Sequence, residues 1–219
     1  YDSGLFVPLN QVETFLKSTV FGIYGSNLLE GGFEEELRKL LSAILNMRSE
    51  MNHKMLHKDT PLSLITGCCP GVMEVGNRLA KELGILSCAN IVDFRVKNNP
   101  VVNEQLSNSY VEAKMTYRLD KLVERQAEFN LDYPIFLAGG IGTDFEFCLE
   151  EVRRKVGATD ATPIILFGEN EYWTQKITSR FQCNLKTGTI KGSEWLSNCF
   201  YCIQHAEQGI KIYRDYFSG

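Results

Sequence analysis

The sequence contains no hydrophobic run that approaches the roughly 20 residues needed to cross a membrane. It also has no excess of positive charge, because 23 Lys and Arg residues stand against 27 Asp and Glu residues, a net charge of −4. Nucleic-acid-binding domains normally carry a basic patch, so this balance argues against such a partner. The start of the chain lacks the pattern of a secretory signal peptide. Together these absences indicate a globular protein of the cytoplasm.

Disulfide and metal signatures are also weak. The seven cysteines form an odd, scattered set, which indicates reduced thiols rather than a disulfide framework. Cys199 and Cys202 have the spacing of a zinc or redox pair, but no second pair accompanies them, and we interpret them as core cysteines of a helical stretch. His53 and His57 have the spacing of one helical turn, again without a third ligand nearby. We therefore expect no metal site.

The length of 219 residues and an ordinary composition fit one α/β domain with a substantial core. We expect residues 1–18 to form an amphipathic segment packed on the outside, and residues 19–219 to form a single domain. The chain begins with Tyr1 rather than Met. This indicates that upstream residues were removed or that the sequence is part of a longer protein.

The hydrophobic pattern alternates between strands and helices along the chain. This order predicts an α/β fold, namely a Rossmann-like doubly wound parallel sheet with helices on both faces. We expect strands at residues 19–24, 62–66, 84–91, 135–137 and 163–168, with a further short strand possible at 110–113. We expect helices at residues 33–47, 71–83, 115–125, 144–156, 169–181 and 193–216.

One stretch, residues 133–146, organises this scheme. A buried strand is followed by a turn containing Gly139, Gly140 and Gly142, which lets a ligand approach the backbone closely. Thr143 and Asp144 favour the start of a helix, and the free amides of a helix N-terminus bind anions. Glu146 follows within the expected first turn. An ordinary glycine-rich connection between a strand and a helix is the alternative interpretation.

A second glycine turn follows the strand at residues 62–66. Gly67 and Gly71 flank it, and Met73 lies in the helix that follows. Ser26 lies in the loop that follows the first strand, where it serves either as a ligand donor or as a turn residue. Because the carboxyl ends of parallel strands meet at one edge of a sheet, these loops are expected to face one another across a crevice. Cys68 lies in this turn and is expected to be packed rather than reactive.

The pattern excludes two common nucleotide chemistries. Neither turn contains the lysine of a Walker A loop, which argues against ATP hydrolysis, and neither has the GxGxxG spacing of a dinucleotide site. A carboxylate beside an anion site repels the anion itself. It suits chemistry on a group attached to the phosphate, such as cleavage of the N-glycosidic bond of a nucleotide.

Residues 139–146, GGIGTDFE, resemble the PGGxGTxxE signature of the LOG-type phosphoribohydrolases, with Ala138 in place of the usual proline. The second turn resembles the GGGPGxM loop of the same family, with two cysteines replacing glycines. Residues 99–104, NPVVNE, resemble the NPxVNE segment of the bacterial pyrimidine and purine nucleotide nucleosidases. Residues 115–118 resemble the MxxRK element, with Leu119 in place of the lysine.

This resemblance implies a nucleoside 5′-monophosphate nucleosidase that releases free base and ribose 5-phosphate without a metal or organic cofactor. It implies that Glu146 acts on the sugar and on the attacking water, and that Arg118 orients the substrate. Glu150, one turn further on, either raises the pKa of Glu146 or is an exposed helix acid. The resemblance also implies a homo-oligomer with sites near the interface. The expected substrate- and phosphate-binding residues are Gly139, Gly140, Gly142, Thr143, Ser26, Gly67, Gly71, Met73 and Asn103.

The competing hypothesis is a non-catalytic, nucleotide-binding or regulatory module of a longer protein. The two cysteines of the second turn and Leu119 favour this alternative. An amino-acid decarboxylase is disfavoured, because no lysine stands in a setting that suits pyridoxal phosphate.

Overall fold

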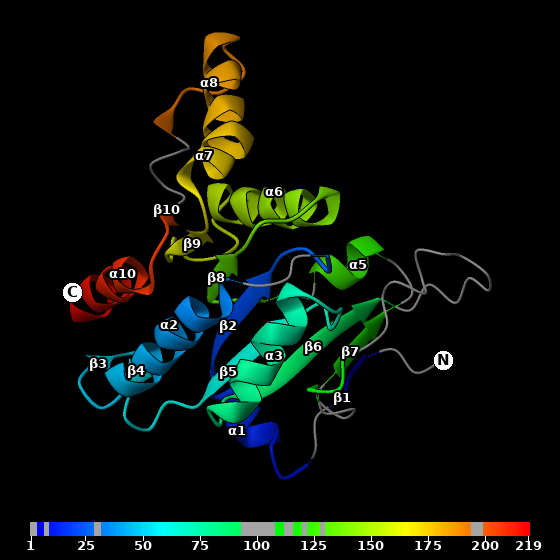
Figure 1. The fold of residues 1–219 in the computed structure, drawn as a ribbon, viewed down its shortest axis with the longest axis vertical. Helices are drawn as coiled ribbons and strands as arrows, with labels where there is room; N and C mark the ends of the chain where they lie inside the picture. Colours follow the sequence, from blue (N-terminus) through cyan, green and yellow to red (C-terminus); the bar gives the residue numbers. More distant parts are fainter. Residues whose placement is uncertain are drawn as a thin grey trace, which may run out of the picture.

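The computed structural model describes residues 4–6, 9–28, 32–92, 108–111, 116–119, 122–127, 130–193 and 199–219. They form an eight-stranded sheet of order β1-β7-β6-β5-β2-β8-β9-β10 and a separate hairpin, β3-β4. All neighbouring strands of the large sheet run parallel except β1, which pairs antiparallel with β7 at one edge. Figure 1 shows this sheet between two groups of helices. The predicted doubly wound α/β architecture is thereby confirmed.

The element bounds follow the predicted alternation closely. The strands are β1 (Gly4–Phe6), β2 (Thr19–Tyr24), β3 (Asn52–His53), β4 (Leu56–His57), β5 (Leu62–Thr66), β6 (Leu86–Val92), β7 (Thr116–Leu119), β8 (Tyr133–Phe136), β9 (Ile164–Phe167) and β10 (Phe200–Ile203). The helices are α1 (Val12–Leu16), α2 (Glu34–Met47), α3 (Val72–Glu82), α5 (Leu122–Ala127), α6 (Ile141–Lys155), α7 (Asn170–Trp173), the π-helix η1 (Thr174–Thr178), α8 (Ser179–Lys186) and α10 (Ala206–Ser218).

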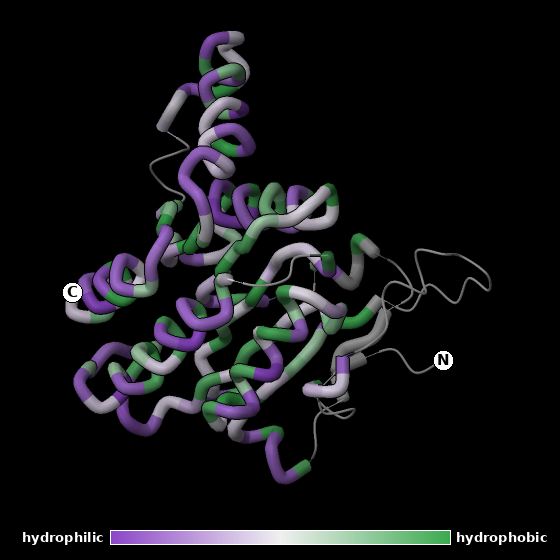
Figure 2. The backbone as a smooth tube through the Cα atoms, in the orientation of Figure 1, coloured by the Kyte–Doolittle hydropathy of each residue, from purple (hydrophilic) through white to green (hydrophobic). Residues whose placement is uncertain are grey.

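The two faces of the sheet bury two separate hydrophobic clusters. Successive strand residues point to opposite faces, so in β9 Ile165 packs with α2, α3 and α10, whereas Ile164 packs with α6 and α7. Figure 2 shows hydrophobic positions recurring between hydrophilic ones along α2, α3 and α10, as expected of helices that cover one face of a sheet. This burial fixes which loops meet at the carboxyl edge of the sheet.

The N-terminal residues contribute to both the sheet and its cover. Gly4–Phe6 form β1, which closes one edge of the sheet, so part of the segment 1–18 belongs to the sheet itself. In α1, Phe15 packs against the cluster under α6 and α7, whereas Leu16 is exposed. No helix among the described ranges has the length and hydrophobicity of a membrane span.

Three local predictions were wrong. Residues 116–119 form strand β7, not the start of a helix, so Arg118 lies in the sheet, where the β-branched and aromatic residues Thr116 and Tyr117 favour a strand. The stretch 193–216 is interrupted by β10, whose pairing with β9 overrides its local helical pattern. Cys202 is therefore an exposed strand residue rather than a core cysteine.

The two histidines of residues 52–57 also have a different setting from the predicted one. His53 and His57 lie on opposite strands of the β3-β4 hairpin, so they are not on consecutive turns of a helix. His53 packs against the rings of Tyr216 and Phe217 on α10, and burial lowers its pKa. Within the described part of the chain, no group of three His, Cys, Asp or Glu residues is placed to hold a metal ion.

Candidate functional site

The candidate site lies where the strand order reverses. The chain passes from β2 to β5 on one side and later returns to β8 on the other side of β2. The Ser26 amide donates to the carbonyl of Ala138 at 3.0 Å, and the Val72 amide donates to the carbonyl of Ser26 at 3.1 Å. These bonds bring together the ends of β2, β5 and β8. Crevices at such reversal points are where open α/β sheets bind ligands.

The first glycine turn is held by side chains that the sequence did not single out. The Tyr172 hydroxyl accepts from the Gly139 amide at 2.9 Å and donates to the Gly139 carbonyl at 2.8 Å. Lys176 Nζ donates to the same carbonyl at 2.6 Å and pairs with Asp144 at 2.7 Å. Burial opposes the charge on Lys176, but the bond to Asp144 gives its pKa a net upward shift. A protonated amine therefore sits beside the turn.

Helix α6 begins at Ile141, three residues earlier than predicted, directly after Gly140. The first amides of an α-helix have no acceptor within the helix, so those of residues 141–143 point out of its N-terminus. Gly140 and Gly142 are exposed there, whereas Thr143 is buried. Glu146 is half-buried in the second turn of α6, about 7.5 Å along the axis from Ile141 at ~1.5 Å per residue. The carboxylate is thus set back from the anion-binding end.

Glu150 is a buried structural residue and not an exposed helix acid. Its carboxylate accepts from Arg154 at 2.5 Å and from the Tyr24 hydroxyl at 3.2 Å. Arg154, which is also buried, donates to the hydroxyl of Thr162 at 3.0 Å. Burial raises the pKa of Glu150, although Arg154 opposes that shift. This network fixes α6 to β2 and to the segment before β9, and thereby fixes the position of Glu146.

The second glycine turn keeps a left-handed backbone despite its cysteines. Cys68 has φ +69° and is buried, so a cysteine occupies a conformation that normally favours glycine. Gly71 has φ +68°, and a Cβ there would lie 2.6 Å from the Ser26 carbonyl oxygen. Only glycine therefore allows the two loops to approach this closely.

A buried amide supports this second turn. Asn77 accepts from Thr66 at 2.6 Å and donates to Ser87 at 3.0 Å and to the Cys88 carbonyl at 3.1 Å. The side-chain amide of Asn108 donates to Asn77 at 3.0 Å. Fully paired buried networks of this kind hold a loop in one conformation. The turn is thus tied to β5, β6 and the segment at residue 108.

The predicted site residues fall into three groups. Ser26, Gly67, Gly71 and Met73 lie in or beside the β2 and β5 loops, together with the residues of the first glycine turn. Arg118 lies on β7, four strand positions from β8 and so roughly 19 Å away at ~4.8 Å per strand. The structure does not bring its backbone near Glu146. Asn103 and the rest of residues 99–104 lie outside the described residues.

Tyr172 and Lys176 are the site residues that sequence reasoning missed. Both belong to a stretch predicted only as an undivided helix, in which η1 interrupts the α-helical hydrogen bonding. π-Helical turns are frequent at functional sites, but no residue type in this stretch predicts one. The contacts to Gly139 become visible only when β8 and α7 are placed side by side.

We expect a methyl group at Gly139 to disrupt the first turn. A Cβ there would lie 2.1 Å from Thr143 Oγ1 and 2.6 Å from Thr143 Cβ. Gly139→Ala should therefore lower the free energy of unfolding by about 1–3 kcal/mol, as overpacking does in a well-packed region. Gly142→Ala is the matched control, because a Cβ at Gly142 meets no atom within 4 Å. Thermal denaturation monitored by circular dichroism compares them, and equal stability would contradict the prediction.

Sequence comparisons find no matching family model and no matching curated protein. Solved structures do match over nearly the whole chain. The molybdenum cofactor binding protein of the phototrophic bacterium Rippkaea orientalis superposes with a TM-score of 0.55 at 15% identity, covering 93% of this chain and 99% of the other. The structural genomics target TM1055 gives 0.53 at 17% identity, covering 90% and 99%. The chain has a Rossmann-like α/β fold.

A third solved structure that matches this chain belongs to a differently named protein. DNA processing protein A of Streptococcus pneumoniae superposes with a TM-score of 0.53 at 11% identity, over 93% of this chain and 63% of the other. At such identities the likeness concerns the fold alone. The chemistry therefore has to be argued from the residues at the crevice.

Proposed function

We propose that the protein is a LOG-type nucleoside 5′-monophosphate nucleosidase that hydrolyses the N-glycosidic bond to free base and ribose 5-phosphate. The observation that carries this proposal is the position of Glu146. It stands in the second turn of a helix whose N-terminus opens at the crevice between the ends of β2, β5 and β8. A carboxylate set back from an anion site is suited to act on a group attached to the anion.

The proposed chemistry assigns separate tasks to the two parts of the site. The substrate phosphate binds at the N-terminus of α6, where backbone amides and the helix dipole favour an anion. The phosphate does not react, and its binding energy positions the sugar. Glu146 stabilises the oxocarbenium-like sugar carbon or activates the water that attacks it. The bond between that carbon and the base nitrogen breaks, and the base leaves with a proton.

Other parts of the proposal rest on the motif resemblance. Arg118 remains our candidate for orienting the substrate, although its backbone lies on β7, away from β8 within the same chain. No metal or organic cofactor is needed for this hydrolysis. We also propose a cytoplasmic location, a homo-oligomeric assembly and a single domain that includes residues 19–219 together with strand β1.

The second candidate is a non-catalytic module that binds nucleotides or related phosphorylated ligands. Two observations favour it. The second turn carries a cysteine at a left-handed position, where the signature has glycine. One of the matching structures belongs to a protein named for binding a cofactor rather than for a reaction. Such a module would use the same crevice and the same anion-binding helix end.

The deciding experiment is chromatographic detection of free base from a panel of nucleoside monophosphates and the corresponding unphosphorylated nucleosides. We expect release from the monophosphates only, because the phosphate anchors the substrate. Equal release from the nucleosides would contradict the role of the phosphate. Binding of monophosphates without release of base from any of them would overturn the enzymatic proposal and support the binding module.

A further inference from the structure

Asp144 places a negative charge in the first turn of α6, at the end of the helix where the substrate phosphate is proposed to bind. An acid in a first turn stabilises a helix, because it interacts favourably with the positive end of the helix dipole. An anionic ligand uses that same positive end. Asp144 therefore competes with the phosphate for one source of positive charge, and Glu146 adds a second negative charge in the next turn.

Lys176 is placed to remove this conflict. Its amine pairs with the Asp144 carboxylate at 2.7 Å and donates to the Gly139 carbonyl at 2.6 Å. The lysine belongs to η1, which continues α7, and Figure 1 shows α7 next to α6. Burial opposes the charge on Lys176, but its bonds to Asp144 and Tyr172 give its pKa a net upward shift, so the amine is protonated at neutral pH. One positive charge thus compensates one of the two acids.

The contacts of the Lys176 amine are directed to the protein. Two of its three N–H donors are engaged by Asp144 and Gly139. The amine also lies 5.2 Å from the centre of the Tyr172 ring, which stands four residues earlier on the same helix face. The Lys176 side chain is 25% exposed, whereas that of Asp144 is 52% exposed. This geometry favours an influence on a bound anion through Asp144 rather than by direct contact.

Support of the Gly139 carbonyl is not the distinctive contribution of Lys176. The Tyr172 hydroxyl donates to the same carbonyl at 2.8 Å and accepts from the Gly139 amide at 2.9 Å. The first glycine turn therefore keeps hydrogen bonds to both backbone groups of Gly139 when the lysine is removed. Tyr172 is uncharged, so it does not supply the positive charge beside Asp144.

We propose that Lys176 is a positioning residue for the substrate phosphate, because it neutralises Asp144 and so leaves the N-terminus of α6 able to accept a dianion. This inference rests on the proposed function, since it concerns the phosphate of the same site. A half-exposed ion pair contributes little to the stability of a fold, so the main effect of the pair is on the charge at the helix end. Without Lys176, two carboxylates oppose the phosphate.

Calorimetric titration of the full chain with inorganic phosphate tests this role without any reaction. Lys176→Met should weaken phosphate binding by roughly tenfold, because an uncompensated charge then lies near the anion in a medium of intermediate dielectric. The double variant Lys176→Met, Asp144→Asn should recover most of the affinity. Lys211→Met is the matched control, because it removes the same charge from a pair with Asp215 on α10, across the sheet from α6. Its phosphate affinity should equal that of the wild type.

Salt separates compensation of charge from support of the turn. In about 1 M salt, where charges are screened within ~3 Å, the difference between Lys176→Met and the wild type should shrink. Tyr172→Phe removes both bonds to Gly139 without changing any charge, so an effect of this variant should not depend on salt in that way. Lys176→Arg keeps the charge and should keep most of the affinity. Circular dichroism establishes that each variant is folded.

Three results would overturn the role of Lys176. They are a wild type that binds no phosphate, an affinity that Lys176→Met leaves unchanged, and a double variant that binds no better than Lys176→Met alone.

The kinetics of base release provide a second readout. Lys176→Met should raise the KM for nucleoside monophosphates roughly tenfold and change kcat only a few-fold, because Glu146 is untouched. An unchanged KM with base release intact would count against the role of Lys176 and not against the proposed function. The expected series of phosphate affinities, without release of base from any nucleotide, would count against the proposed function and not against the role of Lys176.

Discussion

Replacing Glu146 with glutamine is expected to reduce the release of free base from nucleoside monophosphates by roughly 10²–10⁴-fold, the usual contribution of a positioned acid or base. The amide keeps the size of the side chain but cannot carry the negative charge that the sugar carbon requires. The affinity for the monophosphate should change only a few-fold, because the phosphate binds at the N-terminus of α6. Base release followed by chromatography, with binding measured by calorimetry, separates the two quantities.

Glu151→Gln provides the control on the same helix. Glu151 directly follows the buried Glu150 in the sequence and is held by Arg180 at 2.6 Å, so it belongs to the attachment of α8 and not to the crevice. Its replacement should leave the rate of base release nearly unchanged. If Glu146→Gln retained the full rate, the carboxylate would have no role in the chemistry.

Removing the positive charge of Arg154 is expected to produce the largest loss of stability of any change in α6. Arg154→Met leaves Glu150 buried, with a side chain only 1% exposed, and removes the closer of its two cations, since only Arg153 remains, at 3.8 Å. Breaking one partner of a buried ion pair costs about 3–5 kcal/mol. For a chain of this length the melting temperature falls by roughly 2–4 °C per kcal/mol. Denaturant unfolding monitored by circular dichroism measures the change.

The loss should also depend on pH. Burial already raises the pKa of Glu150, and without Arg154 this pKa rises further. The folded variant then binds a proton that the unfolded chain releases above its ordinary glutamate pKa of about 4.3. Its stability therefore falls as the pH rises above that value. A deficit that was the same at pH 5 and pH 8 would contradict this explanation.

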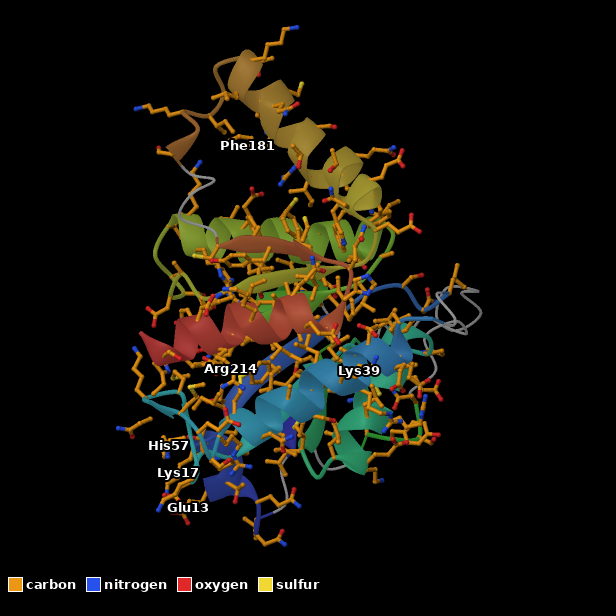
Figure 3. The ribbon with its side chains drawn as sticks, turned by 60° about the vertical axis from the view of Figure 1, so that its left-hand side comes forward. Glu13, Lys17, Lys39, His57, Phe181 and Arg214 are labelled. Atoms are coloured by element: carbon orange, nitrogen blue, oxygen red, sulfur yellow. The ribbon has the colours of Figure 1, made fainter. Side chains whose placement is uncertain are left out.

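An exposed pair of the same geometry serves as the comparison. Glu13 on α1 and Lys17, which caps the C-terminus of this helix, are also four residues apart and 2.5 Å from each other, but their side chains are 82% and 67% exposed. Both lie at the edge of the molecule (Figure 3). Lys17→Met should cost only ~0–1 kcal/mol, as surface ion pairs do. Arg154→Met combined with Glu150→Leu should recover part of the loss, because no uncompensated charge remains buried.

The sequence predicted those parts of the fold that local pattern determines. The bounds of β2 and β5 were correct, because continuous apolar runs between turn signals are typical of strands covered on both faces. The bounds of β10 could not be predicted, since its pairing with Ile164–Phe167 depends on chain that lies more than thirty residues earlier. Hydrophobic periodicity along the sequence carries no information about such a distant pairing partner.

The site was predictable to a similar extent. The two glycine turns were predicted from their glycines. A Cβ at Gly71 would meet the backbone of the Ser26 loop, and a Cβ at Gly139 would meet the side chain of Thr143. The burial of Glu150 was missed, since its partners come from three parts of the chain: Arg154 on its own helix, Tyr24 on β2 and, through Arg154, Thr162 in the segment before β9. The helix predicted at Arg118 was wrong for a related reason, because pairing with β1 and β6 places residues 116–119 in a strand.

The position of β2 in the middle of the sheet also has a consequence for synthesis of the chain. Phe21 on β2 pairs with Tyr133 on β8. One edge of the central strand β2 therefore has no partner until the ribosome has added a further 112 residues. At the usual ~5–20 residues per second, that delay lasts roughly 6–22 seconds. During this interval the growing half-sheet presents an open, apolar edge. A chaperone that binds exposed strand edges would therefore find such an edge on β2 during this interval, before the crevice exists.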